Sequence, residues 1–180
     1  MSRAWYVLGA AFGGTALLLA GLARVDGLSR PSTAAKRALA GEERAEVLET
    51  VRLFNAISRD FYATGGIPTM IDSLPATKLV KHGIFRDTGF LLRNERYLVY
   101  DLARAVPLEV TSDGPDKAEV LVFEEWNYVY QESATRKPVS EVKGMGQGYR
   151  YRLARHEGRW AIHEWAPEDV PAPAGEGFVW

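Results

Sequence analysis

Cysteine is absent from the 180 residues, so the chain forms no disulfide, carries no thiol nucleophile and cannot hold zinc through sulfur. An excess of basic residues is also lacking, since 22 Lys and Arg stand against 23 Asp and Glu, a formal net charge of −1. Recognition of nucleic acid needs a concentrated basic face. We therefore expect no nucleic-acid partner.

Sequence patterns for phosphate, metal or cofactor binding are scarce as well. The segment GMGQG, residues 144–148, lacks the Lys-Ser/Thr pair and the following helix of a phosphate-binding loop, and we expect a flexible connection between strands there. No His or carboxylate pair combines an i, i+4 spacing with the polar surroundings of a metal site. The sequence predicts no cofactor and no metal ion.

Isolated polar residues could serve acid–base chemistry, and the candidates are Asp60, Tyr62, Asp101, Glu125 and His163. One interpretation pairs His163 with Glu125 as a general-base dyad. The other places His163 on a solvent-facing strand position and Asp60 on a solvated helix face. We favour the second interpretation, which leaves no catalytic residue, and we expect a protein that is not an enzyme.

Charge is missing altogether from Ala4 to Ala23. As a helix this run would span about 30 Å, the thickness of the hydrocarbon core of a bilayer. Trp5 and Tyr6 stand at one end, where amphipathic rings prefer the interface. A signal peptide cleaved after Ala23 is the alternative, but its apolar region is usually 7–15 residues long. We expect residues 1–27 to be a retained single-pass membrane anchor that contacts lipid.

Gly9 and Gly13 form a GxxxG pattern within this run, which lets a second membrane helix approach closely. The alternative is that Gly and Ala are simply common in membrane helices. The count of flanking positive charges favours a domain on the cytoplasmic side of the membrane. Arg3 followed directly by apolar residues is instead typical of a signal anchor, which would place the domain on the outer side. We expect the inner (cytoplasmic) membrane of a bacterial cell, with the domain leaning to the periplasm.

The remaining chain divides into a linker at residues 28–41, a domain at 42–168 and a Pro/Gly-rich tail at 169–180. Residues 42–66 predict a long amphipathic helix that ends at Gly65, with one apolar stripe made by Val47, Val51, Phe54 and Phe61. Residues 67–97 predict shorter helices, broken around Pro75 and near Gly83 and Gly89.

The apolar period then changes from 3.6 to 2, which indicates strands. In VPLEV, residues 106–110, alternation places Val106, Leu108 and Val110 on one face. Residues 117–131 predict a central strand, because apolar side chains lie on both of its faces. Residues 148–165 predict a hairpin with its turn at His156-Glu157-Gly158. The order, helices first and an antiparallel meander second, indicates an α+β domain with helices on one sheet face.

A valine-rich strand that ends in Glu124 and Glu125 precedes the motif YxYxLxRxxGxW, here Tyr149 to Trp160. With the helices before it, this pattern resembles the nuclear transport factor 2-like (NTF2-like) superfamily over residues 42–168. The similarity is to membrane-tethered members, which include the intermembrane-space domain of a chloroplast division protein. The resemblance implies a curled sheet wrapped around a helix to form a cone, with an acid or base at the open end in the enzymes of the fold.

Aromatic residues are abundant, with 5 Trp, 8 Tyr and 7 Phe. Trp126, Tyr128 and Tyr130 share one strand face, which either packs in the core or forms a protein interface. The terminal Phe178 and Trp180 would expose large apolar side chains to water unless a partner buries them. These five residues and the two glycines of the anchor are our interaction candidates. We expect an accessory or assembly subunit of a larger membrane-protein complex (division, secretion, respiratory or photosynthetic); the alternative is a small-ligand binder or enzyme that uses the cone cavity.

Overall fold

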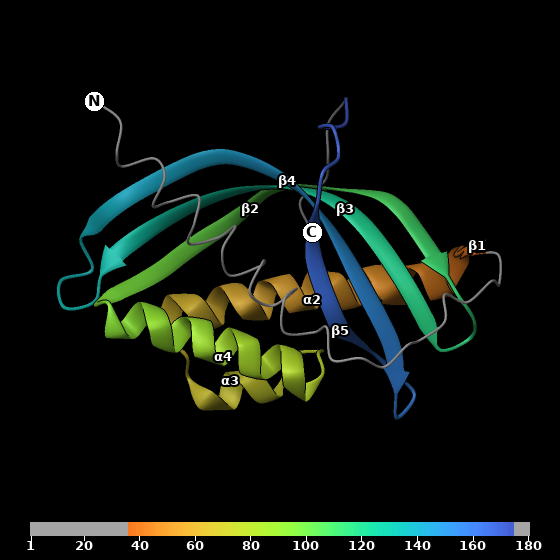
Figure 1. The fold of residues 1–180 in the computed structure, drawn as a ribbon, viewed down its shortest axis with the longest axis horizontal. Helices are drawn as coiled ribbons and strands as arrows, with labels where there is room; N and C mark the ends of the chain where they lie inside the picture. Colours follow the sequence, from red (N-terminus) through yellow and green to blue (C-terminus); the bar gives the residue numbers. More distant parts are fainter. Residues whose placement is uncertain (1–35, 175–180) are drawn as a thin grey trace. The chain divides into compact units, whose positions relative to one another are not determined.

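The computed structural model describes residues 36–174. Their elements follow in the order β1 (Arg37–Ala38), α2 (Gly41–Thr64), α3 (Pro68–Asp72), α4 (Lys78–Arg93), β2 (Arg96–Ser112), β3 (Lys117–Glu132), β4 (Pro138–His156) and β5 (Arg159–Glu168). The strands form one antiparallel sheet in the order β1-β2-β3-β4-β5, and the sheet curves over α2 with α3 and α4 on the same side (Figure 1). The predicted α+β domain with helices on one face of a curled sheet is confirmed.

The predicted membrane anchor, with Gly9 and Gly13, lies outside the described residues, and so do Phe178 and Trp180. Between residues 36 and 174, no helix has both the length and the apolar character needed to cross a bilayer.

The long helix α2 follows the predicted apolar stripe. Val47, Val51 and Phe61 are fully buried and Phe54 nearly so, because the 3.6-residue period turns all four toward the sheet. The helix ends at Gly65, whose φ of 77° is left-handed and whose N–H bonds the carbonyl of Tyr62 at 3.2 Å. A side chain at Gly65 would also collide with the Tyr97 ring. Both the stripe and the stop are therefore confirmed.

The helix α4 runs unbroken through Gly83 and Gly89, so the breaks predicted there are wrong. A glycine inside a helix costs only about 1 kcal/mol relative to alanine. Burial of Val80, Ile84 and Thr88 along the inner side of α4 outweighs that cost. The interruption around Pro75 is confirmed, since it separates α3 from α4.

The strand β3 is central, paired with β2 on one side and β4 on the other, as its two apolar faces predict. The alternation predicted for VPLEV fails at Leu108, which falls at a bulge because Pro107 pairs with Val122 and Glu109 with Leu121. Leu108 is 40% exposed as a result, whereas Val110 is buried.

The segment GMGQG is not a loop but part of β4, which corrects the prediction for residues 144–148. Its glycines are needed because neighbouring groups lie against the outer face of this strand. A Cβ on Gly146 would lie 2.6 Å from Cζ of Phe123, and one on Gly148 would collide with Val170. The absence of side chains lets β4 pair with β3 beneath these groups.

The domain extends past both predicted boundaries. Within the segment predicted as a linker, β1 pairs with the end of β2, and the buried Leu39 donates its N–H to Val110 at 3.0 Å. Within the predicted tail, Val170 lies against β4, and the carbonyl of Pro173 accepts a hydrogen bond from Arg104 at 2.8 Å. Residues 36–40 and 169–174 are therefore parts of the packed domain.

The predicted hairpin turn is confirmed between β4 and β5. Glu157 and Gly158 connect His156 to its partner Arg159, and both turn residues have positive φ, as a two-residue hairpin turn requires. Trp160, two residues beyond the glycine, is 6% exposed and belongs to the same core cluster as Phe54.

Candidate functional site

The aromatic face of β3 is turned inward. Trp126 packs edge-on against Tyr100 with ring centroids 5.2 Å apart, and Tyr128 packs against Tyr130 at 6.0 Å. Tyr128 is buried, and Trp126 and Tyr130 are partly buried. The shared face is thus confirmed, but it is the inner wall of the cone and not an open surface. Tyr62 of α2 closes the opposite side, with its ring 5.9 Å from Tyr100.

The most unusual group on this inner wall is the carboxyl of Glu124, which is 1% exposed. Asn55 of α2 donates its side-chain N–H to Oε1 at 2.8 Å, and Tyr151 of β4 donates its hydroxyl to the same oxygen at 2.9 Å. The indole N–H of Trp126 reaches Oε2 at 3.0 Å. Side chains of α2 and β4, 69 and 27 residues away in the sequence, therefore converge with Trp126 of the same strand on one carboxyl group.

Burial raises the pKa of Glu124 to about 7, even though its three hydrogen bonds favour the charged form and oppose the rise. The cluster of Glu124, Asn55, Trp126 and Tyr151, called here the Glu124 cluster, can form its hydrogen bonds with the carboxyl either ionised or protonated. In the ionised state Tyr151 donates to Oε1. In the protonated state the carboxyl can donate to the Tyr151 oxygen, because that hydroxyl has a second acceptor in Oδ1 of Asn55 at 3.2 Å. Near neutral pH the Glu124 cluster can thus hold or release one proton without leaving a polar group unpaired.

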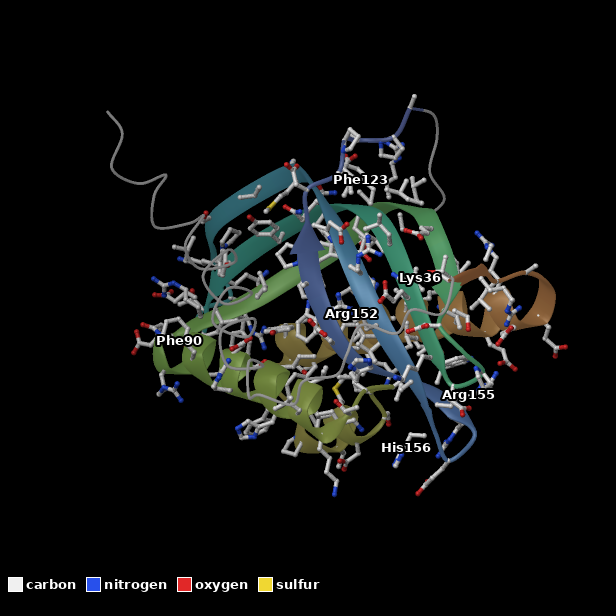
Figure 2. The ribbon with its side chains drawn as sticks, turned by 45° about the vertical axis from the view of Figure 1, so that its right-hand side comes forward. Lys36, Phe90, Phe123, Arg152, Arg155 and His156 are labelled. Atoms are coloured by element: carbon white, nitrogen blue, oxygen red, sulfur yellow. The ribbon has the colours of Figure 1, made fainter. Side chains whose placement is uncertain are left out.

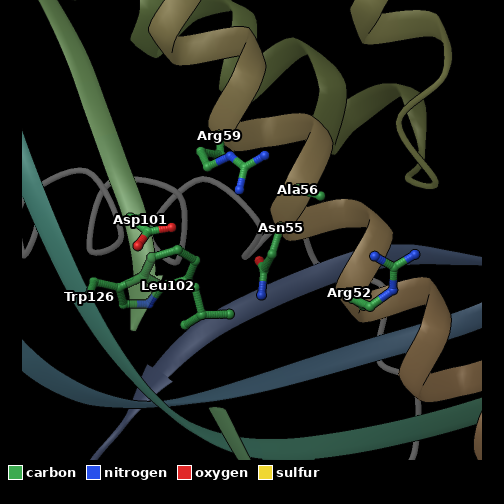
Figure 3. A pocket seen from close by; sticks show the side chains of 7 residues that line it. All are labelled: Arg52, Asn55, Ala56, Arg59, Asp101, Leu102 and Trp126. Atoms are coloured by element: carbon green, nitrogen blue, oxygen red, sulfur yellow. The ribbon is translucent and has the colours of Figure 1, made fainter. Parts of the chain in front are cut away.

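A cavity of about 160 Å³ opens beside this cluster, lined by Arg52, Asn55, Ala56, Arg59, Asp101, Leu102 and Trp126. In Figure 3, Arg52, Asn55 and Arg59 come from the helix side and Asp101 and Trp126 from the strand side. Asn55 and Trp126 both line the cavity and bind Glu124, so they stand between the carboxyl group and the space.

Charge at the cavity is largely neutralised by neighbours on α2. Arg52 binds Glu49 through two hydrogen bonds at 2.5 and 2.6 Å, and Arg59 binds Asp60 at 2.9 Å. Asp101 adds a carboxylate from the strand side. The arrangement can accept a small polar molecule, but its two guanidinium groups already have carboxylate partners.

The predicted polar candidates do not form one site. Asp60 is exposed and paired with Arg59, as a solvated helix face implies. Tyr62 lies on the inner wall, where burial raises its pKa above the ordinary range, and Asp101 lines the cavity. Among the titratable side chains named from the sequence, only Asp101 reaches the cavity.

The dyad of His163 and Glu125 does not form. His163 is an unpaired bulge residue of β5, since Ile162 pairs with Leu153 and Glu164 with Arg152. The His163 side chain is exposed, but partial desolvation at the sheet surface lowers its pKa, and its charged neighbours are Glu164, Arg152, Lys117 and Glu119. The favoured interpretation, in which His163 lies on the sheet surface, is confirmed.

Glu124 was missed as a site residue, although the sequence carried a signal for it. It lies in phase with Val120, Val122, Trp126 and Tyr128, all of which face the interior. Alternation alone therefore placed a carboxyl in the core, where a charge needs hydrogen-bonding partners. The partners Asn55 and Tyr151 could not be assigned, because they lie 69 and 27 residues away along the chain.

No group of three His, Asp or Glu side chains within residues 36–174 is placed to hold a metal ion. No protein-family model matches the chain, and no curated protein matches it in sequence.

Solved structures do resemble it. The intermembrane-space region of the chloroplast protein ARC6 superposes with a TM-score of 0.57 at 13% identity, over 71% of this chain and 98% of that one. A ketosteroid isomerase-like protein from Erwinia carotovora atroseptica gives 0.46 at 14% identity, over 74% and 100% of the two chains. A candidate dehydratase of the NTF2-like family from Streptomyces avermitilis gives 0.46 at 16%, over 71% and 99%. The superposition on the ARC6 region confirms the NTF2-like fold that the sequence resemblance implied.

Proposed function

We propose that the protein is a non-enzymatic, membrane-anchored interaction module, an accessory or assembly subunit of a larger membrane-protein complex. The observation that carries this proposal is the filled interior of the cone. Phe54 packs against Tyr151 and Trp165, with ring centroids 6.1 and 5.5 Å apart, so the domain's own aromatics occupy the space that a substrate would need.

The cavity beside the Glu124 cluster is too small for most ligands. Its volume of about 160 Å³ lies well below the roughly 300–1,000 Å³ typical of small-molecule sites. The carboxyl of Glu124, whose pKa lies near neutrality, is 1% exposed and stands behind Asn55 and Trp126. This geometry favours a structural role for the Glu124 cluster.

Location supports the same proposal. The uncharged run from Ala4 to Ala23 would hold the domain at the inner membrane, leaning to the periplasm. Gly9 and Gly13 would offer a close-packing strip to a partner helix. Phe178 and Trp180 would supply a second, apolar contact. With the aromatic face of β3 turned inward, these two regions are the stronger partner contacts.

The test is recovery of partners with the full chain, solubilised in mild detergent and analysed by mass spectrometry. Deleting Phe178-Val179-Trp180, or replacing Gly9 and Gly13 with Ile, should release the partners, because each change removes an apolar contact. The matched polar variants Asp60→Ala and His163→Ala should retain them. Partner recovery that is unchanged in both apolar variants contradicts the proposal.

A second function is favoured by one observation, the proton-accepting Glu124 cluster beside a cavity. In that case the protein binds or converts a small ligand in the cone. Glu124→Gln keeps the size of the side chain and removes its titration. If this variant loses cellular function while it stays folded and keeps its partners, the cavity has a chemical role and the ligand-binding function is the correct one.

A further inference from the structure

The outer side of α4 combines large apolar side chains with basic ones. Leu79 is 68% exposed, Phe90 57% and Phe85 48%, and with Leu92 they make four of the eight large apolar side chains that are exposed within residues 36–174. Figure 2 shows Phe90 at the outer surface of α4. Leu79 and Phe90 are eleven residues apart, which is three helical turns, so they lie on one line along the helix.

The charges of this helix are mostly positive. Its sequence holds four basic residues, Lys78, Lys81, Arg86 and Arg93, and one acidic residue, Asp87. The Asp87 side chain is only 17% exposed and lies 3.6 Å from the guanidinium of Arg86. His82 and Arg86 occupy the turns between Leu79 and Phe90 on the same line. The exposed side of α4 is therefore apolar and basic.

We propose that α4 docks on the surface of an anionic lipid bilayer, with Leu79 and Phe90 entering the headgroup region. Helices that lie in the membrane interface combine an apolar face with Lys and Arg, which attract anionic lipids. Charge complementarity favours this occupant over a basic or neutral surface. A protein groove that buries these residues would instead have to provide several carboxylates opposite one helix.

The distance between the proposed membrane anchor and the domain is short enough for this contact. At this step the inference rests on the proposed anchor. Residues 24–35 connect the apolar run to the described domain. Fully extended, a stretch of that length spans at most about 40 Å. The anchor would therefore keep the domain close to the bilayer, where a modest affinity of α4 for lipid is sufficient to orient it.

The experiment uses the full chain in lipid nanodiscs. Because the chain has no cysteine, His82→Cys introduces a unique site for a spin label on the exposed line of α4. A second label at Glu141→Cys is the control, since Glu141 pairs with Val129 on the outer face of the sheet, away from α4. Collisions with oxygen, which enters the bilayer, are compared with collisions with a water-soluble nickel complex.

In phosphatidylglycerol discs the label at position 82 should show an oxygen-to-nickel ratio several-fold higher than in phosphatidylcholine discs, while position 141 should not change. Replacing Lys78, Arg86 and Arg93 with Gln should abolish the difference. The matched variant replaces Lys117, Lys143 and Arg159 with Gln, which removes the same charge elsewhere, and should keep it. Phe90→Glu should also abolish the difference.

A chain that enters both discs with position 82 equally open to water overturns the docking and leaves the anchor intact. A chain that co-elutes with neither disc overturns both. If position 82 is open to water in discs but becomes shielded when partners bind, α4 is a protein contact and the lipid proposal is wrong.

Discussion

Glu124 occupies a strand position where the alternation of β3 otherwise places apolar or aromatic side chains. It remains there because Asn55, Tyr151 and Trp126 satisfy both of its oxygens. A buried group of this kind adds specificity to the packing of α2 against the sheet, since no other register of the two elements would bring the same donors to it. It also makes the stability of the domain depend on pH.

The direction of that dependence follows from the raised pKa. Between its ordinary value of 4.5 and its value of about 7 in the fold, Glu124 binds a proton in the folded state and not in the unfolded chain. Stability from this group is thus complete below 4.5 and is lost as the pH rises through 7. The difference corresponds to about 3 kcal/mol in the free energy of unfolding.

Denaturant unfolding of the wild type and of Glu124→Gln between pH 4.5 and 8 measures this effect. The wild type should lose about 3 kcal/mol relative to the variant over that range, and the comparison cancels the other titrating groups. A difference that stays flat, or that moves in favour of the wild type at high pH, would show that the three donors keep Glu124 ionised in the folded state.

Trp160 gives a second prediction at the same scale. Its large side chain is 6% exposed within the main core cluster, so Trp160→Ala should cost about 3–5 kcal/mol in the free energy of unfolding. Arg159→Ala, at the exposed neighbouring position, should change it by less than about 0.5 kcal/mol. Equilibrium unfolding in urea compares the two, and a loss below about 1 kcal/mol for Trp160→Ala would mean that the indole is not a core group.

Among the elements, long periodic segments were predictable and interruptions were not. The stripe of α2, the central position of β3 and the turn at Glu157-Gly158 all follow from local pattern. Gly83 and Gly89 inside α4 and the glycines of β4 were misassigned, because a glycine's neighbours decide whether it breaks an element or permits close packing. Those neighbours, such as Phe123 against Gly146, come from other parts of the chain.

This contrast between glycines can be measured. Gly146→Ala places a Cβ 2.6 Å from the ring of the buried Phe123 and should cost about 1–3 kcal/mol. Gly89→Ala in α4 meets only the flexible end of Arg93 at 3.5 Å and should stabilise the domain by about 0.5–1 kcal/mol. Thermal and denaturant melts report both, and equal tolerance of the two substitutions would contradict the packing of Phe123 over β4.

Across the whole molecule, the fold was accessible from the sequence and the candidate site was not. The order of helices and strands predicted the α+β domain, and the resemblance carried by the hairpin motif ending at Trp160 implied the NTF2-like cone. The Glu124 cluster depends on Asn55 and Tyr151, which meet only when α2 lies across β3 and β4. Side chains that meet only in the folded structure leave almost no recognisable motif in the local sequence.

The anchor is the remaining prediction at this scale. The run from Ala4 to Ala23 has full spanning length, so the mature protein should keep it. Intact mass of the protein extracted from membranes should correspond to the whole chain, less at most Met1. A mature protein that begins at Arg24 would identify the run as a cleaved signal peptide.

The shortest strand, β1, has a mechanical consequence. It consists of Arg37 and Ala38, paired with Ser112 and Thr111 at the edge of the sheet, and is followed by the buried Leu39. Tension transmitted from the N-terminal side reaches this edge before it reaches any other part of the domain. Two paired residues separate at a lower force than the long ladder of hydrogen bonds between β2 and β3. Residues 36–40 would therefore detach from the sheet first and lengthen the chain segment before the domain by about 15 Å. Residues 36–40 thus form a short segment that can extend under force while the rest of the domain stays folded.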